Sequence, residues 1–242
     1  MTRKEQEILL KKRFILKCTL DLMEELKIDE ITTKEIADRS QYSKGSLYTY
    51  FINKDEILLA LMYSSLSLWS DVQRWAISNH EHNLLKLGYI GLSRKVFLEE
   101  YAVMYRCNML YKDIDFSSLE KSSYLPQLQK LSKIDIEGPF RNTIEEGVKK
   151  GEIVWESSPQ MLICLLESFS EGVFSKIETG IKTGDTYCEG EQLHEEYISF
   201  IGRTLSPNKP INFHYNKQSF KNELKSAIPI NPDYAIDKYI LQ

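Results

Sequence analysis

The sequence predicts an all-α protein, and three observations lead to that expectation. No proline precedes Pro126 in the 242-residue chain, and only Gly45, Gly88 and Gly91 interrupt the same stretch, so helix breakers are sparse there. Apolar residues recur there every three or four positions, which is the helical period. A β-sandwich or barrel would need turn residues about every 8–12 positions, which excludes that class.

The first predicted helix covers residues 3–27. Ile15, Cys18, Leu22 and Leu26 recur at three- and four-residue steps and form one apolar stripe. The start of this helix is basic, because residues 1–17 contain six Lys or Arg against two Glu.

Two short helices follow, and each has its own start signal. Thr32 and Glu35 form an S/T-x-x-E capping box, which predicts a helix over about 32–39. A turn at Ser40-Gln41-Tyr42 leads to Ser43, which can cap a second helix over 44–50. Two short helices joined by a three-residue turn are typical of a helix-turn-helix, whose second helix can lie in the DNA major groove.

The rest of the chain is also predicted to be helical, apart from its end. Asn53 can cap the next helix, and Pro159 suits the first turn of a later one. The expected helices are 54–77, 84–111, 126–150 with a break at Gly138-Pro139, 159–179 and 191–205. We expect 78–83 and 112–125 to be loop-like, and the Pro- and Asn-rich tail 206–242 to contain one short helix near 216–227.

The segment from Thr32 to Leu58 resembles the helix-turn-helix of the TetR (tetracycline-repressor-like) family. The family pattern is T-x-x-x-I-A, then S-x-G-x-L-Y-x-(Y/H)-F, then K-(E/D)-x-L. Leu58 lies one position beyond the last leucine of the pattern, and ten residues match the pattern at fixed spacing: Thr32, Ile36, Ala37, Ser43, Gly45, Leu47, Tyr48, Tyr50, Phe51 and Lys54. The turn departs from the usual Ala-Gly-Val, so Gln41 is expected to take the positive φ that glycine adopts easily.

The resemblance implies a DNA-binding role for the residues around this motif. Lys44, Ser46, Thr49 and Tyr42 are placed to address base edges or nearby sugars. Gly45 allows the backbone to approach DNA closely, and Ser43 caps the recognition helix. Tyr48, Tyr50, Thr32, Thr33, Lys34 and Lys54 are better placed for phosphates.

The remaining helices are predicted to form a dimerisation and effector-binding body. The 159–179 helix is apolar on more than one face, so we expect it to build a homodimer interface with 191–205, as in the family. The family also places a small-molecule pocket among the middle helices, although ordinary core packing explains each candidate equally well. The candidates are Trp69, Tyr89, Phe97, Tyr101, Met104, Tyr105, Asn108, Glu167 and Phe169.

The expected organisation is therefore a three-helix helix-turn-helix domain over 1–53, a helical effector-binding and dimerisation domain over 54–205, and an extension over 206–242. The resemblance implies a ligand-responsive transcriptional regulator, most simply a repressor that binds a palindromic double-stranded operator as a dimer and is released by a small molecule. We expect no cofactor or metal, and the effector, the operator and the role of the tail remain open.

The net charge, the four cysteines and the length of the apolar runs limit which other classes of function are possible. The net charge of −4 arises after residue 60, because the first sixty residues contain equal numbers of basic and acidic groups. Cys18, Cys107, Cys164 and Cys188 are far apart, which favours free buried thiols in a cytoplasmic protein over a zinc site. No apolar run is long enough to span a membrane.

Two alternatives remain open. One is a helical interaction module without sequence-specific DNA binding. The other, weaker, is an enzyme, because the chain lacks the common nucleotide-binding and hydrolase motifs, and His80-Glu81-His82 lies in a polar loop with no nearby third ligand.

Overall fold

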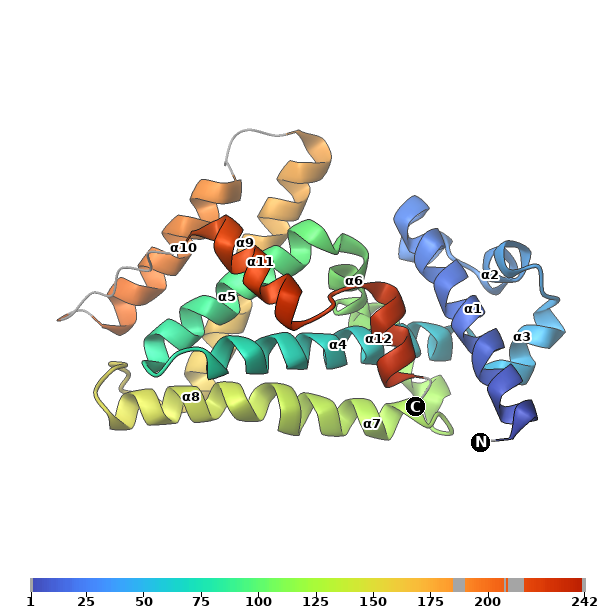
Figure 1. Cartoon of the computed structure of the whole chain (residues 1–242), viewed down its shortest axis with the longest axis horizontal. Helices are drawn as coiled ribbons and strands as arrows, with labels where there is room; N and C mark the ends of the chain where they lie inside the picture. The colour runs from blue at the N-terminus through green and yellow to red at the C-terminus, as the bar shows by residue number, and fades with distance from the viewer. Residues whose placement is uncertain (1, 185–189, 207, 209–215, 241–242) are drawn as a thin grey trace. The chain divides into compact units, whose positions relative to one another are not determined.

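The computed structural model describes residues 2–184, 190–206, 208 and 216–240, and over these residues it contains helices and no strand (Figure 1). The expected all-α class is confirmed. Contacts divide the described residues into two compact units. The first unit lies within Met1–Trp69, Tyr101–Ser132 and Pro229–Gln242, and the second within Ser70–Glu100 and Lys133–Ile228. The expected domain boundaries at residues 53 and 205 differ from the bounds of these units and stay a prediction about which parts fold independently.

The first unit is built around its first helix. Helix α1 packs against α2, α3, α6 and α12. The core contains Ile15, Leu16 and Met23 of α1, Ile36 of α2 and Leu47 of α3, all at most 1% exposed. Its elements are α1 (Arg3–Glu25), a 3-10 turn (Ile28–Glu30), α2 (Thr33–Ser40), α3 (Lys44–Tyr50), the start of α4 (Lys54–Ser78), α6 (Ala102–Cys107), 3-10 turns at Leu110–Lys112 and Phe116–Leu119, α7 (Tyr124–Lys130) and α12 (Pro232–Tyr239).

The second unit is a bundle in which α5 packs against α8, α9 and α10. Leu84 and Phe97 of α5, Ile144 of α8 and Phe174 of α9 are fully buried in its core. Its elements are the end of α4, α5 (Asn83–Glu100), most of a π-helical segment (Leu131–Glu137), α8 (Gly138–Lys149), α9 (Pro159–Thr183), α10 (Gly190–Leu205) and α11 (Lys217–Ala227).

The prediction of one helix over 84–111 is wrong. The helix stops at Glu100, and Tyr101 has φ −141° and ψ 51°, outside the helical region, before α6 begins at Ala102. Neither Gly88 nor Gly91 causes this break. The two glycines lie inside α5, where a Cβ on Gly91 would come within 2.8 Å of the Ile198 side chain of α10. Close packing of α5 on α10 therefore favours glycine at position 91.

The expected break at Gly138-Pro139 takes the form of a widened helical segment just before these residues. Residues Leu131–Glu137 are π-helical, and Pro139 lies in the first turn of α8. Proline has no amide hydrogen and cannot donate to the carbonyl four residues earlier, which belongs to Asp135. The Ser70 hydroxyl donates to this carbonyl at 3.1 Å and satisfies it.

The loop-like interpretation of 112–125 and the account of the tail also need correction. Residues 112–125 contain the Phe116–Leu119 3-10 turn and the start of α7. In the tail, the helix expected near 216–227 is present as α11, but α12 was not anticipated. Asn231 caps α12 by accepting from the Tyr234 amide at 2.7 Å, and Pro232 fills its first position.

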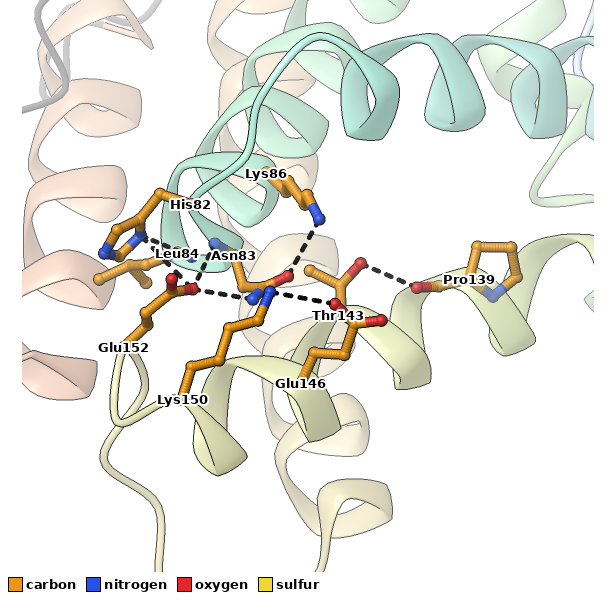
Figure 2. A network of polar contacts seen from close by, with 9 residues as sticks. All are labelled: His82, Asn83, Leu84, Lys86, Pro139, Thr143, Glu146, Lys150 and Glu152. Carbon is orange, nitrogen blue, oxygen red and sulfur yellow. Dashed lines mark hydrogen bonds and ion pairs between the residues drawn. The ribbon is translucent and has the colours of Figure 1, made fainter.

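A polar network joins the start of α5 to the end of α8 (Figure 2). The backbone amide and the side-chain amide of Asn83 both donate to Glu152 Oε2 at 2.8 Å, and Asn83 is fully buried. His82 Nδ1 lies 4.0 Å from the same carboxylate oxygen. A Cβ on Gly147 would lie 2.5 Å from the Ile153 side chain and 3.0 Å from the Cβ of Asn83, so a larger residue would force these neighbours to shift. Glu152 thus supplies an acceptor and a negative charge to the amino terminus of α5.

We expect the Glu152→Gln variant to be less stable than the parent by roughly 1–2 kcal/mol near neutral pH, because it loses charge-assisted hydrogen bonds. Partial burial by itself raises the pKa of Glu152, but the bonds from Asn83 outweigh it, helped by His82 and Lys150, and hold the pKa below 4.5. A lowered pKa means that the carboxylate stabilises the fold fully above pH 4.5 and that this contribution disappears as the pH falls through the folded-state pKa.

Urea unfolding at several pH values checks this expectation. The difference between parent and variant should stay constant above about pH 5.5 and shrink at lower pH. Exposed Glu145 on α8 provides the matched control, and Glu145→Gln should leave the unfolding free energy nearly unchanged. A difference that grows toward acid would contradict the role given to Glu152.

Candidate nucleic-acid interface and candidate effector residues

The Thr32 side chain caps the amino terminus of α2 as expected, but the second hydrogen bond of the capping box is missing. The Thr32 hydroxyl accepts from the Lys34 and Glu35 amides at 3.2 and 3.4 Å. The return bond of the expected capping box does not form, and Glu35 Oε2 is buried without a hydrogen-bond partner. Thr32 and Lys34 are exposed and Thr33 is partly exposed, so this helix start is open to an external anion.

The turn between α2 and α3 has the strained residue that the sequence suggested. Gln41 has φ 56° and ψ 26°, and it is the one non-glycine residue with positive φ in the described parts of the chain. The Tyr42 amide donates to the Ala37 carbonyl at 3.0 Å, which closes the end of α2. Ser40 belongs to the helix and not to the turn, and its hydroxyl donates to the Ile36 carbonyl at 2.6 Å.

We expect Gln41→Gly to raise the free energy of unfolding by about 0.5–1 kcal/mol, because glycine adopts this conformation without a Cβ penalty. Gln41→Val should lower it by about 1–2 kcal/mol, since a β-branched side chain is least tolerant of positive φ. Chemical denaturation followed by circular dichroism measures both. At Gln6, which is exposed in α1, the same Gln→Gly change should destabilise instead. If Gln41→Gly and Gln6→Gly changed the free energy of unfolding in the same direction, the turn would not be strained.

Helix α3 presents a polar face and buries Leu47, which is 1% exposed. The Ser43 hydroxyl accepts from the Ser46 amide at 3.1 Å and so caps the helix as expected. Lys44, Gly45, Tyr48 and Thr49 are exposed, and Tyr48 retains 54% of its accessible surface. A Cβ on Gly45 would meet nothing nearer than the Ser43 hydroxyl at 3.8 Å. Packing within the protein therefore does not require glycine at position 45, and this favours close approach of an external partner.

Two of the expected tyrosines belong to an aromatic cluster that supports the turn. The rings of Phe14 and Tyr42 meet edge to face at 6.3 Å, and those of Tyr42 and Tyr50 lie 6.2 Å apart. Lys11 lies above the Tyr50 ring at 5.9 Å. This packing leaves Tyr42 and Tyr50 only partly exposed, so each combines a structural role with an accessible edge.

Lys54 and Asn53 order the start of α4 beside the motif. Lys54 Nζ donates to the Ile31 carbonyl at 3.1 Å, just before the Thr32 cap. Asn53 Oδ1 accepts from the Glu56 amide at 2.9 Å, as the capping prediction stated. Lys54 thereby holds two helix amino termini near each other, an arrangement suited to binding phosphates. The contact with Ile31 was not visible in the sequence because 23 residues separate the two.

The nine candidate effector residues are distributed over both units. Phe97, Met104 and Tyr105 are buried core residues. Tyr89 is partly exposed and stacks on His80 at 3.6 Å. The first unit contains Trp69, Tyr101, Met104, Tyr105 and Asn108, and the second contains Tyr89, Phe97, Glu167 and Phe169. Their role in binding a ligand stays a prediction.

Four large apolar side chains are exposed on α9 and α10. Met161, Leu165, Phe169 and Phe200 retain between 40% and 52% of their accessible surface. The rings of Phe169 and Phe200 lie 6.0 Å apart across the two helices. Phe169 also lines a shallow groove of about 450 Å³ together with Ser168, Gly172, Val173, Lys176 and Leu193. A single chain thus leaves these apolar side chains exposed, alongside exposed charged residues such as Glu171 and Glu195.

Glu167 lies among these exposed residues of α9. Loss of hydration by neighbouring atoms raises the pKa of its carboxyl, and the positive charge of Arg94 opposes that rise.

Within the described parts of the chain, the remaining chemical groups give no sign of a metal site or a disulfide. No cluster of three or more His, Cys, Asp or Glu side chains suited to a metal occurs among the described residues. Cys18 and Cys107 are buried free thiols, and burial raises the pKa of Cys107 to about 12. Cys164 is exposed, contrary to the expectation of buried thiols, and Cys188 falls outside the described residues. No described helix combines the length and apolarity needed to cross a membrane.

The capped α2, the turn at Gln41 and the exposed face of α3 define a helix-turn-helix DNA-binding domain. Residues 15–61 match the sequence model described as bacterial regulatory proteins of the tetR family. This amino-terminal part of the chain therefore belongs to the TetR family, which confirms the resemblance noted in the sequence. No curated protein sequence matches the chain.

Solved structures of transcriptional regulators share the fold of most of this chain, beyond the helix-turn-helix domain alone. The regulator FadR from Bacillus subtilis, in complex with stearoyl-CoA, has a TM-score of 0.60 at 15% identity, with 79% of this chain and 98% of that one covered. The MbdR regulator from Azoarcus sp. CIB has a TM-score of 0.58 at 20% identity, with coverage of 79% and 96%. AibR in complex with isovaleryl coenzyme A and operator DNA has a TM-score of 0.60 at 15% identity, with coverage of 83% and 100%.

Proposed function

We propose that this protein is a ligand-responsive transcriptional regulator that binds a palindromic operator as a homodimer, represses transcription there and is released by a small molecule. The observation that carries the proposal is the exposed polar face of α3, with Lys44, Tyr48 and Thr49 around an unobstructed Gly45, inside a TetR-family domain. Such a helix fits the major groove, where lysine and hydroxyl groups meet base edges. A protein of this kind acts in the cytoplasm and has no catalytic role.

The proposed contacts divide by the chemistry of each side chain. Exposed Lys44 and Thr49, with Ser46 and Tyr42, address base edges, while Ser43 caps the helix and Gly45 permits close approach. Phosphate contacts come from the two helix starts and the outer tyrosines, namely Thr32, Thr33, Lys34, Tyr48, Tyr50 and Lys54. Ser46 contributes least through its hydroxyl, because that group is already 2.9 Å from the Ser43 hydroxyl.

The proposed dimer forms through the exposed apolar side chains of α9 and α10. A two-fold axis would bury Met161, Leu165, Phe169 and Phe200 against their copies. It would also place two recognition helices on half-sites about one DNA turn apart, or a multiple of it.

The proposed effector is an apolar molecule with one polar anchor, bound among the candidate residues of the helical body. Since FadR and AibR were solved with acyl-coenzyme A compounds, acyl-coenzyme A thioesters are the first class to test. The effector would act by population shift, binding better to a conformer with poor DNA affinity. Nearly complete release would require about 5.5 kcal/mol of differential affinity.

Selection from a random pool of duplex DNA, followed by gel shift at low salt, tests the proposal. We expect enrichment of an inverted repeat and weaker binding of that duplex when an acyl-coenzyme A series is added. Enrichment of no sequence would reject the regulator function and favour a helical interaction module. Enrichment without any response to acyl-coenzyme A would reject only this effector class.

A further inference from the structure

Lys12 of α1 lies between two aromatic rings of the first unit. Its Nζ is 5.2 Å from the centre of the Phe51 ring and 5.6 Å from the centre of the Tyr124 ring. Phe51 caps the carboxyl end of α3, and Tyr124 is the first residue of α7. The two aromatic residues are only 2% and 6% exposed, so the cation meets them in partly desolvated surroundings, where a cation–π contact is stronger than at an open surface. Lys12 therefore connects the end of the recognition helix to a distant segment of the chain.

The charges around Lys12 also act on the loop between α3 and α4. Burial lowers the pKa of Lys12, and the carboxylate of Glu56 opposes this fall. Glu56 is 6% exposed, and its Oε2 accepts from the Ile52 amide at 2.6 Å. Burial raises the pKa of the Tyr124 phenol to about 12, so its ring is neutral near pH 7. The lysine thus supplies the positive charge of a cluster that includes the loop directly after α3.

A second connection joins the same loop to the same distant segment. Asn53 Nδ2 donates to the Ser118 hydroxyl oxygen at 2.9 Å, while Asn53 Oδ1 caps α4. The Ser118 hydroxyl donates in turn to the Asp115 carbonyl at 2.8 Å. Asp115 Oδ1 accepts from the Ser117 amide at 3.0 Å and so orders this 3-10 turn locally. One asparagine side chain therefore holds both the start of α4 and the 3-10 turn.

We propose that residues 115–124 belong to the DNA-binding unit and that Lys12 is a positioning residue, which fixes the carboxyl end of α3 through Phe51 and Tyr124. Helix α3 has seven residues, too few to be stable without its neighbours. Neither Lys12 nor residues 115–124 lie in the part that the family model matches, residues 15–61. The inference rests on the proposed function for its effect on DNA, whereas the ordering of α3 concerns this chain alone.

Hydrogen exchange of the full-length protein tests the ordering of α3 without DNA. Lys12→Met keeps a long apolar side chain and removes the charge, and we expect amides of residues 47–51 to exchange about two- to tenfold faster. Ser118→Ala removes the second connection and should speed the same amides about two- to fivefold. Lys12→Arg should restore the parent rates, because a guanidinium also stacks on aromatic rings. Exposed Lys27 and Ser123 provide the controls, and Lys27→Met and Ser123→Ala should change nothing.

A pair of variants at Tyr124 separates the ring contact from general support of the fold. Tyr124→Phe keeps the ring and should leave the effect of Lys12→Met unchanged. Tyr124→Leu removes the ring, so Lys12→Met should cost less protection in that chain. An equal effect of Lys12→Met with and without the ring, no restoration by arginine, or an equal acceleration of exchange in α2 would overturn the positioning role.

Binding to the selected duplex tests the consequence for DNA. Lys12→Met should lower operator affinity about three- to tenfold, by the loss of the cation–π contacts. The slope of log affinity against log salt concentration should not change, because Lys12 contacts rings and not phosphates. A slope that falls by about one unit would make Lys12 a phosphate ligand and overturn the positioning role. Failure to select any duplex would instead reject the proposed function and leave the exchange result standing.

Discussion

Replacing Lys44 by alanine should lower affinity for the selected operator about 10- to 100-fold and relax the base preference at one position of each half-site. Lys44 is exposed at the first position of α3, where a side chain can reach base edges. Losing such a contact costs roughly 1–3 kcal/mol of discrimination. Fluorescence anisotropy with the operator and with single-base variants of it measures both effects.

Lys54→Ala should behave differently on the same duplexes. It should lower the affinity for operator DNA and for scrambled DNA by similar factors. The slope of log affinity against log salt concentration should fall by about one unit, as expected for a lost phosphate contact. Lys54 also donates to the Ile31 carbonyl, so a purely structural role would lower affinity without changing that slope. Exposed Lys27 serves as the control. If Lys44→Ala and Lys54→Ala act alike, the proposed division into base and phosphate contacts is wrong.

The second large effect is expected at Phe169. The Phe169→Glu variant should shift the protein from dimer to monomer at micromolar concentration, because it places a charge in the middle of the proposed apolar interface. Central aromatic anchors contribute about 2 kcal/mol or more, so the dimer dissociation constant should rise at least about 30-fold. Sedimentation velocity over a range of concentrations measures it.

The dimer prediction has a control on the same chain and an independent consequence. Val148 on α8 is also exposed, at 36%, and Val148→Glu should leave the dimer intact. The Phe169→Glu monomer should lose most of its affinity for the palindrome while still folding normally by circular dichroism. If the wild-type protein sediments as a monomer, or if the Phe169→Glu variant remains a dimer, then α9 and α10 do not form the dimer interface.

The local signals in the sequence were accurate where neighbouring residues decide the structure. Thr32, Ser43 and Asn53 cap the helices they were expected to cap, because a cap needs only a side chain and an amide two or three residues away. Gln41 takes positive φ because the turn geometry requires it there. These local devices, with the spacing of Leu47 and Phe51, were enough to place the candidate DNA-binding face.

Predictions failed where a distant residue decides the outcome. The split between α5 and α6 at Tyr101 has no local breaker, so the periodicity of 84–111 concealed it. The Ser70 hydroxyl donates to the Asp135 carbonyl, which Pro139 cannot bond because proline has no amide hydrogen. Ser70 and Asp135 are 65 residues apart, so nothing nearby along the chain indicates this hydrogen bond. The same holds for Glu152, which caps α5 from 69 residues away.

The sequence by itself determined the all-α class, the helix-turn-helix with its caps and its strained turn, and the TetR resemblance, because each depends on spacing along a few turns of helix. Only the tertiary structure decided which tyrosines pack and which remain exposed, that Lys54 holds the Ile31 carbonyl, and that the tail returns to α1 through Asp233 and Asp237. Burial and ion pairing depend on which surfaces meet after folding. A carboxylate on the last helix carries no local sign that its partner is an arginine 224 residues earlier.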